Sequence, residues 1–140
     1  MPVVAEETVR LSWYRALAAR AAVGVARLLI LLPPRRLRLV LTALSRGSRP
    51  ATAAQALRAR QAVVSVSARC AGQGCLQRSV AAVLLARLSG RWPDWCTGIR
   101  TAPFRAHAWL EVAGDPVGEP PDTALYRATM TVRHDAGPRR

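Results

Sequence analysis

The spacing of apolar residues changes near Gly90, and this change constrains the fold more than any other feature of the chain. Before it, apolar residues recur at helical spacing in four stretches, 8–32, 35–44, 52–68 and 75–88. After it, apolar and polar residues alternate as in β-strands, at 95–101, 104–112 and 126–132. Helices followed by strands within 140 residues predict one domain with an α+β fold.

Segments rich in Pro, Gly and Ser mark the breaks between these elements. Pro33 and Pro34 end the first helix, and residues 45–50 form a predicted linker. A loop is expected at 70–74 and a turn at 113–116. We divide the single domain, 1–140, into a helical N-terminal region at 1–69, a core at 70–133 and a frayed tail at 134–140.

Cys75 is the first candidate for chemistry, because it follows a Gly-rich turn and begins an apolar helical segment. The positive end of the helix dipole there favours the thiolate over the thiol. His107 stands 32 residues later in the predicted strand 104–112. Alternation places it opposite the face that carries Phe104, Ala106, Ala108, Leu110 and Val112. A cysteine with a histidine base is the pair that a cysteine hydrolase requires.

A third group must orient the histidine and stabilise its charged form. Glu111 is four residues along the strand from His107, about 13 Å away, and Asp115 is farther still. Glu119 and Asp122 remain, and the register of the hairpin decides between them. Paired residue numbers with an even sum would bring Glu119 close to His107, whereas an odd sum would bring Asp122 opposite it.

Three neighbouring side chains are candidates for supporting roles. Gln73 could add an amide donor to the backbone N–H of Cys75 and so complete an oxyanion hole. Arg78, one helical turn after Cys75, could support the thiolate or bind substrate. Trp109 could shield His107 or line a substrate groove, or simply pack in the core.

The cysteine pattern and the glycine pattern indicate no metal and no cofactor. The spacing C-x4-C followed by C-x10-H lacks the short C-x2-C pairs of structural zinc sites. No Walker or Rossmann glycine pattern is present. An odd number of cysteines without a signal-peptide pattern predicts free thiols and a cytoplasmic location.

Charge is distributed unevenly along the chain. Residues 8–93 contain 15 arginines and no Asp or Glu, and the whole chain has a net charge of +13. Such a surface attracts an acidic partner. Nucleic acid is disfavoured as that partner, because residues 35–91 have no aromatic side chains among their arginines. The apolar stretch 21–32 is too short for a transmembrane span but leaves open a helix on a membrane surface.

Three strings resemble one enzyme family in combination. They are Cys75-Leu-Gln-Arg78-Ser79, Pro103-Phe-Arg-Ala-His107-Ala-Trp109-Leu-Glu111-Val and Gly118-Glu119-Pro120. Over roughly residues 70–133 the chain resembles the stand-alone lasso-peptide maturation protease. The resemblance implies a papain-related, transglutaminase-like core, in which a Cys-bearing helix packs on a small antiparallel sheet. The family has an acid, usually Asp, twelve residues after the histidine, and here that residue is Glu119.

The resemblance also implies a reaction and its partners. The enzyme would be a cysteine endopeptidase that removes the leader from a ribosomal precursor peptide, and a cyclase would then join the freed amine to an Asp or Glu side chain. Leader binding would be left to a separate small recognition protein, since the helical first half shows no strands for capturing an extended leader. The acid-free region 8–93 is the expected docking surface. The alternative function is a non-enzymatic, arginine-rich helical module that binds an acidic protein or an anionic surface.

Overall fold

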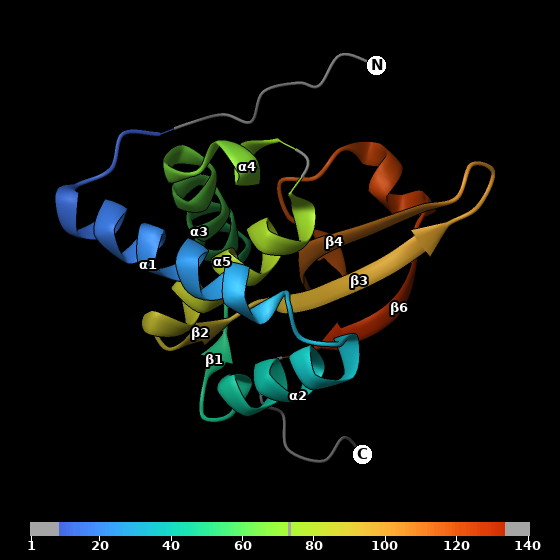
Figure 1. Ribbon diagram of the computed structural model, residues 1–140, viewed down its shortest axis with the longest axis horizontal. Helices are drawn as coiled ribbons and strands as arrows, with labels where there is room; N and C mark the ends of the chain where they lie inside the picture. The colour runs from blue at the N-terminus through green and yellow to red at the C-terminus, as the bar shows by residue number, and fades with distance from the viewer. Residues whose placement is uncertain (1–8, 73, 134–140) are drawn as a thin grey trace.

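The computed structural model describes residues 9–72 and 74–133. Among these residues, five α-helices precede most of the strands (Figure 1). The helices are α1 (Trp13–Leu29), α2 (Pro34–Ser45), α3 (Ala53–Val66), α4 (Ala68–Ala71) and α5 (Cys75–Leu88). The strands are β1 (Arg49–Pro50), β2 (Arg91–Trp92), β3 (Asp94–Arg100), β4 (Arg105–Val112), β5 (Asp115–Pro116) and β6 (Arg127–Val132), with a 3-10 helix, η1, at Pro121–Leu125. The predicted α+β fold is confirmed.

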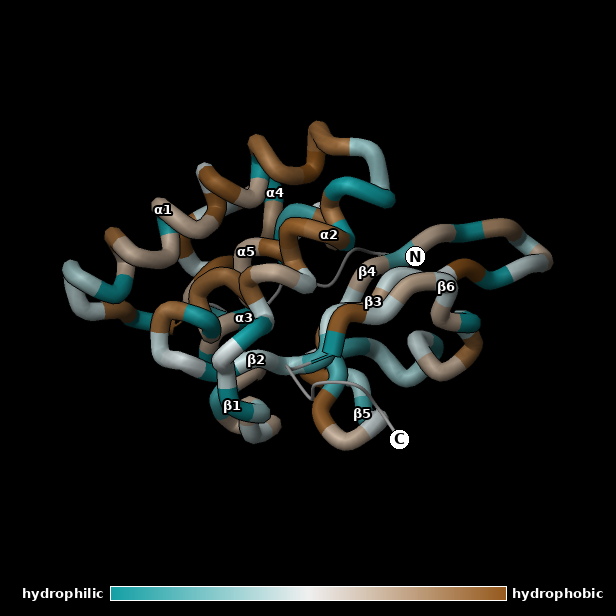
Figure 2. The backbone as a smooth tube through the Cα atoms, turned by 90° about the horizontal axis from the view of Figure 1, so that it is seen from below, coloured by the Kyte–Doolittle hydropathy of each residue, from teal (hydrophilic) through white to brown (hydrophobic). Residues whose placement is uncertain are grey.

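Helix α5 lies between the other helices and the sheet. It packs against α1 and α3 on one side and against β4 on the other. The side chains in its middle turns are small and fully buried, which lets the neighbouring helices approach closely. These residues are Val80, Ala81, Ala82 and Val83. Apolar residues also run along α1 and α2 (Figure 2), and Ala22, Ala26, Leu37 and Leu41 join the same core. The Cys-bearing helix is therefore held firmly on both sides.

The main sheet is antiparallel, with strand order β5-β4-β3-β6. Gly98 on β3 pairs with His107 on β4, and a bulge follows Thr97 where β3 meets β6. A separate two-residue parallel pairing joins β1 to β2. The far end of the β3–β4 hairpin extends beyond the helices (Figure 1). Phe104 lies there with 69% of its surface exposed, so its expected place on the core face is wrong.

Most predicted elements agree with the structure, and the differences have local causes. Helix α5 begins and ends where the sequence predicted, and Gly90 follows it with a φ of 76° that favours glycine. The first two residues of the loop expected at 70–74 belong instead to the one-turn helix α4. The side chain of Ser67 caps this helix by accepting a hydrogen bond from the Cys70 N–H at 3.2 Å. Across the described residues, the helices are too short or too polar to span a membrane.

Candidate active site

Cys75 is the first residue of α5 and is half-buried. The first helical hydrogen bond runs from the Arg78 N–H to the Gly74 carbonyl, at 2.8 Å, so the N–H groups of the first turn have no acceptor further up the helix. The chain before the cysteine is packed tightly, since a Cβ on Gly74 would lie 2.8 Å from the Arg69 carbonyl oxygen. Cys75 is thus presented at the positive end of the helix by a compact turn.

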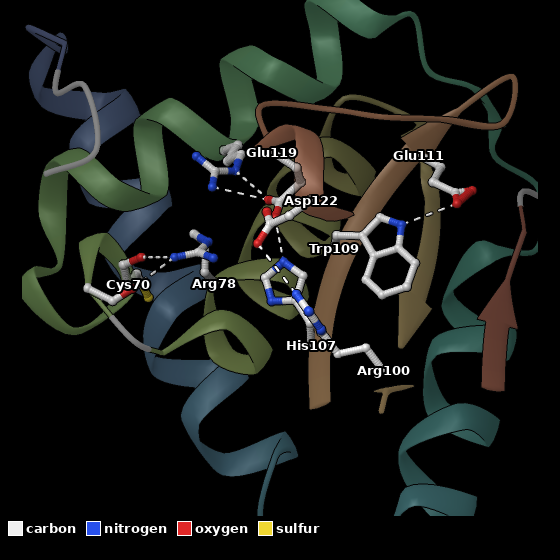
Figure 3. Close-up of polar contacts among 10 residues, drawn as sticks. Cys70, Arg78, Arg100, His107, Trp109, Glu111, Glu119 and Asp122 are labelled. Atoms are coloured by element: carbon white, nitrogen blue, oxygen red, sulfur yellow. Dashed lines mark hydrogen bonds and ion pairs between the residues drawn. The ribbon is translucent and has the colours of Figure 1, made fainter. Parts of the chain in front are cut away.

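His107 faces Cys75 from β4. Hydrogen bonding from His107 and from the backbone of Ala108 acts to lower the pKa of the thiol. Nε2 of His107 is engaged by Oε1 of Glu119 (Figure 3), so Nδ1 is the nitrogen left for Cys75. This arrangement, with the acid on one ring nitrogen and the thiol on the other, is the one that a thiol-imidazole pair needs.

Glu119 is buried, with only 2% of its side chain exposed. Its two oxygens have different partners. Oε1 contacts His107, and Oε2 accepts hydrogen bonds from Nε and Nη2 of Arg60 on α3, at 3.3 and 3.2 Å. The structure therefore places Cys75, His107 and Glu119 in one continuous line, with Arg60 behind the acid.

The route by which Glu119 reaches His107 differs from the one expected. Strand β5 pairs Glu111 with Pro116, an odd residue sum, which on the sequence argument would have brought Asp122 opposite His107. The ladder ends at Pro116, however, and Gly118 turns the chain with a φ of 66°. Glu119 then returns to the histidine from a loop rather than from the ladder. The register rule used for this choice is therefore wrong.

Asp122 pairs with Arg100 rather than with the histidine. Its side chain is 57% exposed, and its Oδ2 is 4.0 Å from Nη1 of Arg100 (Figure 3). An exposed pair at this distance contributes little to stability. Its position in η1 gives it no contact with His107 among the hydrogen bonds and ion pairs of the described residues.

The electrostatics of the Cys75-His107 pair favour charge separation. Burial opposes the thiolate, but the hydrogen bonds from His107 and Ala108, together with the charges of His107 and Arg78, lower the pKa of the Cys75 thiol. Burial likewise opposes the imidazolium, yet Cys75 and Glu119 outweigh it and raise the pKa of His107 to about 9. Both shifts favour the ion pair of a Cys75 thiolate and a His107 imidazolium over the neutral pair.

Arg78 is buried and braces the turn in front of the cysteine. Its Nη1 donates to the carbonyl oxygens of Cys70 and Gly72, at 2.9 and 3.1 Å (Figure 3). Its charge also contributes to the lowered pKa of Cys75. Arg78 thus supports the thiol from the helix side. Gln73, the other expected supporting residue, lies outside the described residues.

Aromatic rings cover the outer side of the imidazole. Trp109 is buried and stacks on His107, with ring centroids 5.7 Å apart and an interplanar angle of 17°. Tyr126 tilts against the same imidazole at 5.4 Å. Trp109 also donates from Nε1 to Oε1 of Glu111 at 3.2 Å, which fixes the indole (Figure 3). These rings limit the access of water to His107, and Trp109 packs rather than lining the pocket described below.

An open pocket of about 470 Å³ adjoins the reactive pair. Cys75 and His107 stand at its edge, and the rest of the lining is mostly apolar: Pro34, Leu76, Thr97, Gly98, Ile99, Ala106, Ala108, Thr129 and Met130. Such a pocket can hold an apolar side chain of a bound peptide next to the thiol.

Sequence reasoning missed two residues of this site, Arg60 and Tyr126. A signal for Arg60 was present: Ala56 and Val63, four residues before and three after it, share its helical face and are fully buried. A lone arginine on a buried face needs an acidic partner, which points to Glu119. Tyr126 had no comparable signal, since one aromatic at a strand start is common.

A cysteine at the N-terminus of a helix, packed on an antiparallel sheet that carries the histidine, defines a papain-like or transglutaminase-like fold. The chain matches the Transglutaminase-like superfamily over residues 19–131 and belongs to it. That superfamily includes cysteine proteases and transferases with a Cys-His-Asp triad. The match begins within α1, so it reaches into the helical region as well as the core. No curated protein and no solved structure matches the chain significantly.

Proposed function

We propose that this chain is a cysteine endopeptidase that removes the leader from a ribosomally made lasso precursor peptide. The observation that carries the proposal is the line of Cys75, His107 and Glu119 beside an open apolar pocket. The three strings that resemble the lasso maturation protease select this reaction among those of the superfamily.

Acylation begins when the Cys75 thiolate attacks the carbonyl carbon of the scissile peptide bond. The oxygen becomes an oxyanion, which the N–H of Cys75 is placed to stabilise at the start of α5. His107 then gives its proton to the amide nitrogen, the C–N bond breaks, and the amine of the product peptide leaves. The leader stays attached through a thioester to Cys75.

Deacylation runs the same proton transfers in reverse. His107 takes a proton from a water molecule, and the hydroxide attacks the thioester carbon. The C–S bond breaks, the leader departs with a new carboxylate, and the thiolate is restored. Glu119 holds Nε2 of His107 throughout, so that Nδ1 faces the reacting atoms.

Leader recognition is proposed to come from a separate protein that docks on the helical region. A second pocket, of about 430 Å³, lies between α1, α3 and α5, and Arg15, Arg58 and Arg91 line it together with Tyr14 and Leu85. Its residues all belong to the acid-free segment 8–93, which suits an acidic partner segment with an apolar anchor. The freed amine would pass to a cyclase, and the process would be cytoplasmic.

The test is a cleavage time course followed by mass spectrometry, using the precursor with and without the leader-binding protein. Cleavage should be slow for the chain alone and strongly accelerated by the partner, because tethering raises the local concentration of the scissile bond. The acceleration should weaken a few-fold as salt rises past physiological strength. Full-speed processing without the partner would contradict recognition in trans.

Replacing Cys75 or His107 by Ala in the same assay should lower the cleavage rate by at least about a thousandfold, because each removes an essential part of the nucleophile. Binding of the leader-partner complex should stay unchanged, since neither residue lines the second pocket between α1, α3 and α5. If either variant processes precursor at the wild-type rate, the protease assignment is wrong and the binding-module alternative gains ground.

A further inference from the structure

Arg60 is a buried arginine that contacts Glu119, the acid in the line of Cys75, His107 and Glu119. The mechanism above gives Arg60 no role. Its side chain is 6% exposed, and it approaches Glu119 with two guanidinium nitrogens. It comes from α3, 59 residues before the acid, so the contact is not a by-product of local geometry. Burying a guanidinium is costly unless its partners are well placed.

The loop that carries Glu119 is shaped around this arginine. Gly118 has a φ of 66°, and a Cβ at that position would lie 2.9 Å from Cδ and 3.2 Å from Nε of Arg60. A residue with a side chain would therefore push Arg60 away from the acid. Gly118 and Arg60 fit each other, and this fit sets where Glu119 enters the site.

The acid itself needs such support more than an aspartate would. The superfamily triad has Asp, whereas this chain has Glu, whose additional methylene adds one rotatable bond. Arg60 holds Oε2, and Oε1 is left to His107. The planar fork of an arginine restricts both the position and the rotation of the carboxylate.

We propose that Arg60 is a positioning residue that holds the carboxylate of Glu119 aimed at Nε2 of His107. The proposal rests on the proposed role of the Cys75-His107-Glu119 line. Without Arg60, Oε2 of Glu119 loses the two hydrogen bonds that fix the carboxylate, and the side chain can rotate away from His107. Glu119 would then support the imidazolium less, and the Cys75 thiolate that pairs with it would be disfavoured.

The test is the pH dependence of Cys75 alkylation by iodoacetamide, followed by peptide mass spectrometry. In Arg60→Gln the alkylation profile should move to higher pH, with a rate about tenfold lower at pH 7, which corresponds to one pKa unit. Arg60→Lys keeps the charge and should recover part of the loss. The opposite shift, to lower pH, would mean that Arg60 only competes with His107 for Glu119, and it would overturn the proposal, as would an unchanged profile in a folded variant.

Arg87→Gln is the matched control. Arg87 also donates two hydrogen bonds, to the carbonyls of Leu44 and Arg46, but it lies twelve residues after Cys75 on α5, about 18 Å along the helix. The Arg87→Gln substitution removes the same charge as Arg60→Gln and should leave the pH dependence of Cys75 alkylation unchanged. A shift of equal size in Arg87→Gln would show that general charge, rather than position, is responsible.

A double-mutant cycle covers the case in which Arg60→Gln fails to fold. Arg60→Met combined with Glu119→Gln removes both charges of the buried pair, which is tolerated better than removing one. If Arg60 acts through Glu119, the double variant should alkylate like Glu119→Gln alone. A further loss in the double variant would overturn the proposal. Because alkylation needs no precursor, these results stand apart from the identity of the substrate.

Discussion

The N-terminal turn of α5 holds the half-buried Cys75 and the middle of β3 holds the buried Cys96, and the two thiols are opposite in character. Burial raises the pKa of Cys96 on β3 to about 12, helped by the negative charges of Glu111 and Asp94. Burial also opposes ionisation of Cys75, but His107, Ala108 and Arg78 reverse the effect and lower its pKa. Burial therefore does not identify the reactive thiol; the charges and hydrogen bonds facing it do.

The surroundings of the two cysteines differ in the same way as their pKa values. The residues paired with Cys96 on the two adjoining strands are Trp109 and Thr131, neither of which carries a charge. Around Cys75, a helix terminus, a histidine on the sheet and an arginine one turn later converge. Chemistry is concentrated where the helical region meets the sheet, and the sheet interior serves for packing.

Selective alkylation is the measurement that would break this contrast most clearly. At pH 7, iodoacetamide should modify Cys75 at least about a thousandfold faster than Cys96, since a thiol with a pKa of about 12 is almost entirely protonated. Cys70 should also react slowly, because burial raises its pKa. Brief labelling followed by peptide mass spectrometry gives all three rates in one experiment.

Equal labelling of the three thiols in folded protein would remove Cys75 as the nucleophile. Labelling in denaturant supplies the control, since unfolding should make the three rates similar.

Two carboxylates that lie close together in sequence sharpen the contrast further. Glu119→Gln should lower kcat/KM for precursor cleavage by about a hundredfold or more, because the imidazolium loses its buried partner. Asp122→Asn should change it by less than about threefold, since its side chain is exposed and meets only Arg100 at 4.0 Å among the ion pairs of the described residues. Steady-state kinetics of the two variants provide the comparison. A crippled Asp122→Asn beside a near-normal Glu119→Gln would reverse the assignment of the third residue.

The smallest of these effects is in the pH profile. The pKa of His107 is raised from 6.5 to about 9, so the imidazolium needed to protonate the leaving amine persists through neutral pH and is lost above about pH 9. We expect kcat/KM to hold a plateau and then fall about tenfold per pH unit beyond that point. In Glu119→Gln the pH at which kcat/KM begins to fall should move down toward 6.5, the ordinary pKa of a histidine. A limb that begins near 6.5 in the wild type would mean that the thiolate-imidazolium pair does not form.

The sequence predicted the elements better than it predicted how they meet. The bounds of α5 followed from a Gly-rich turn before Cys75 and from Gly90 after Leu88, both of which are local signals. Strand alternation left Glu119 and Asp122 open, and the family resemblance favoured Glu119; the odd register that the structure has would have favoured Asp122. A ladder that stops after Pro116 and a loop that folds back depend on packing against Arg60, which strand alternation cannot reveal.

Arg60 itself shows a second limit. Arg60 is one of two buried residues among fifteen arginines in an acid-free segment, and composition alone predicts a solvated surface that attracts a partner. Only its place on the face shared with Ala56 and Val63 sets it apart. Conversely, the aromatic stacking of Trp109 on His107 follows from strand alternation, which places both side chains on one face.

The pairing of Arg60 with Glu119 also determines when the chain becomes competent during synthesis. Glu119 is added 59 residues after Arg60 and twelve residues after His107, so the carboxylate is the last of these groups to be made. Closing so long a loop is entropically costly and waits for the helices and the sheet to dock. A nascent or truncated chain that stops short of Gly118 carries a cysteine and a histidine without the anchored acid. The line of Cys75, His107 and Glu119 on which the proposed function depends can therefore form only after Glu119 has been added.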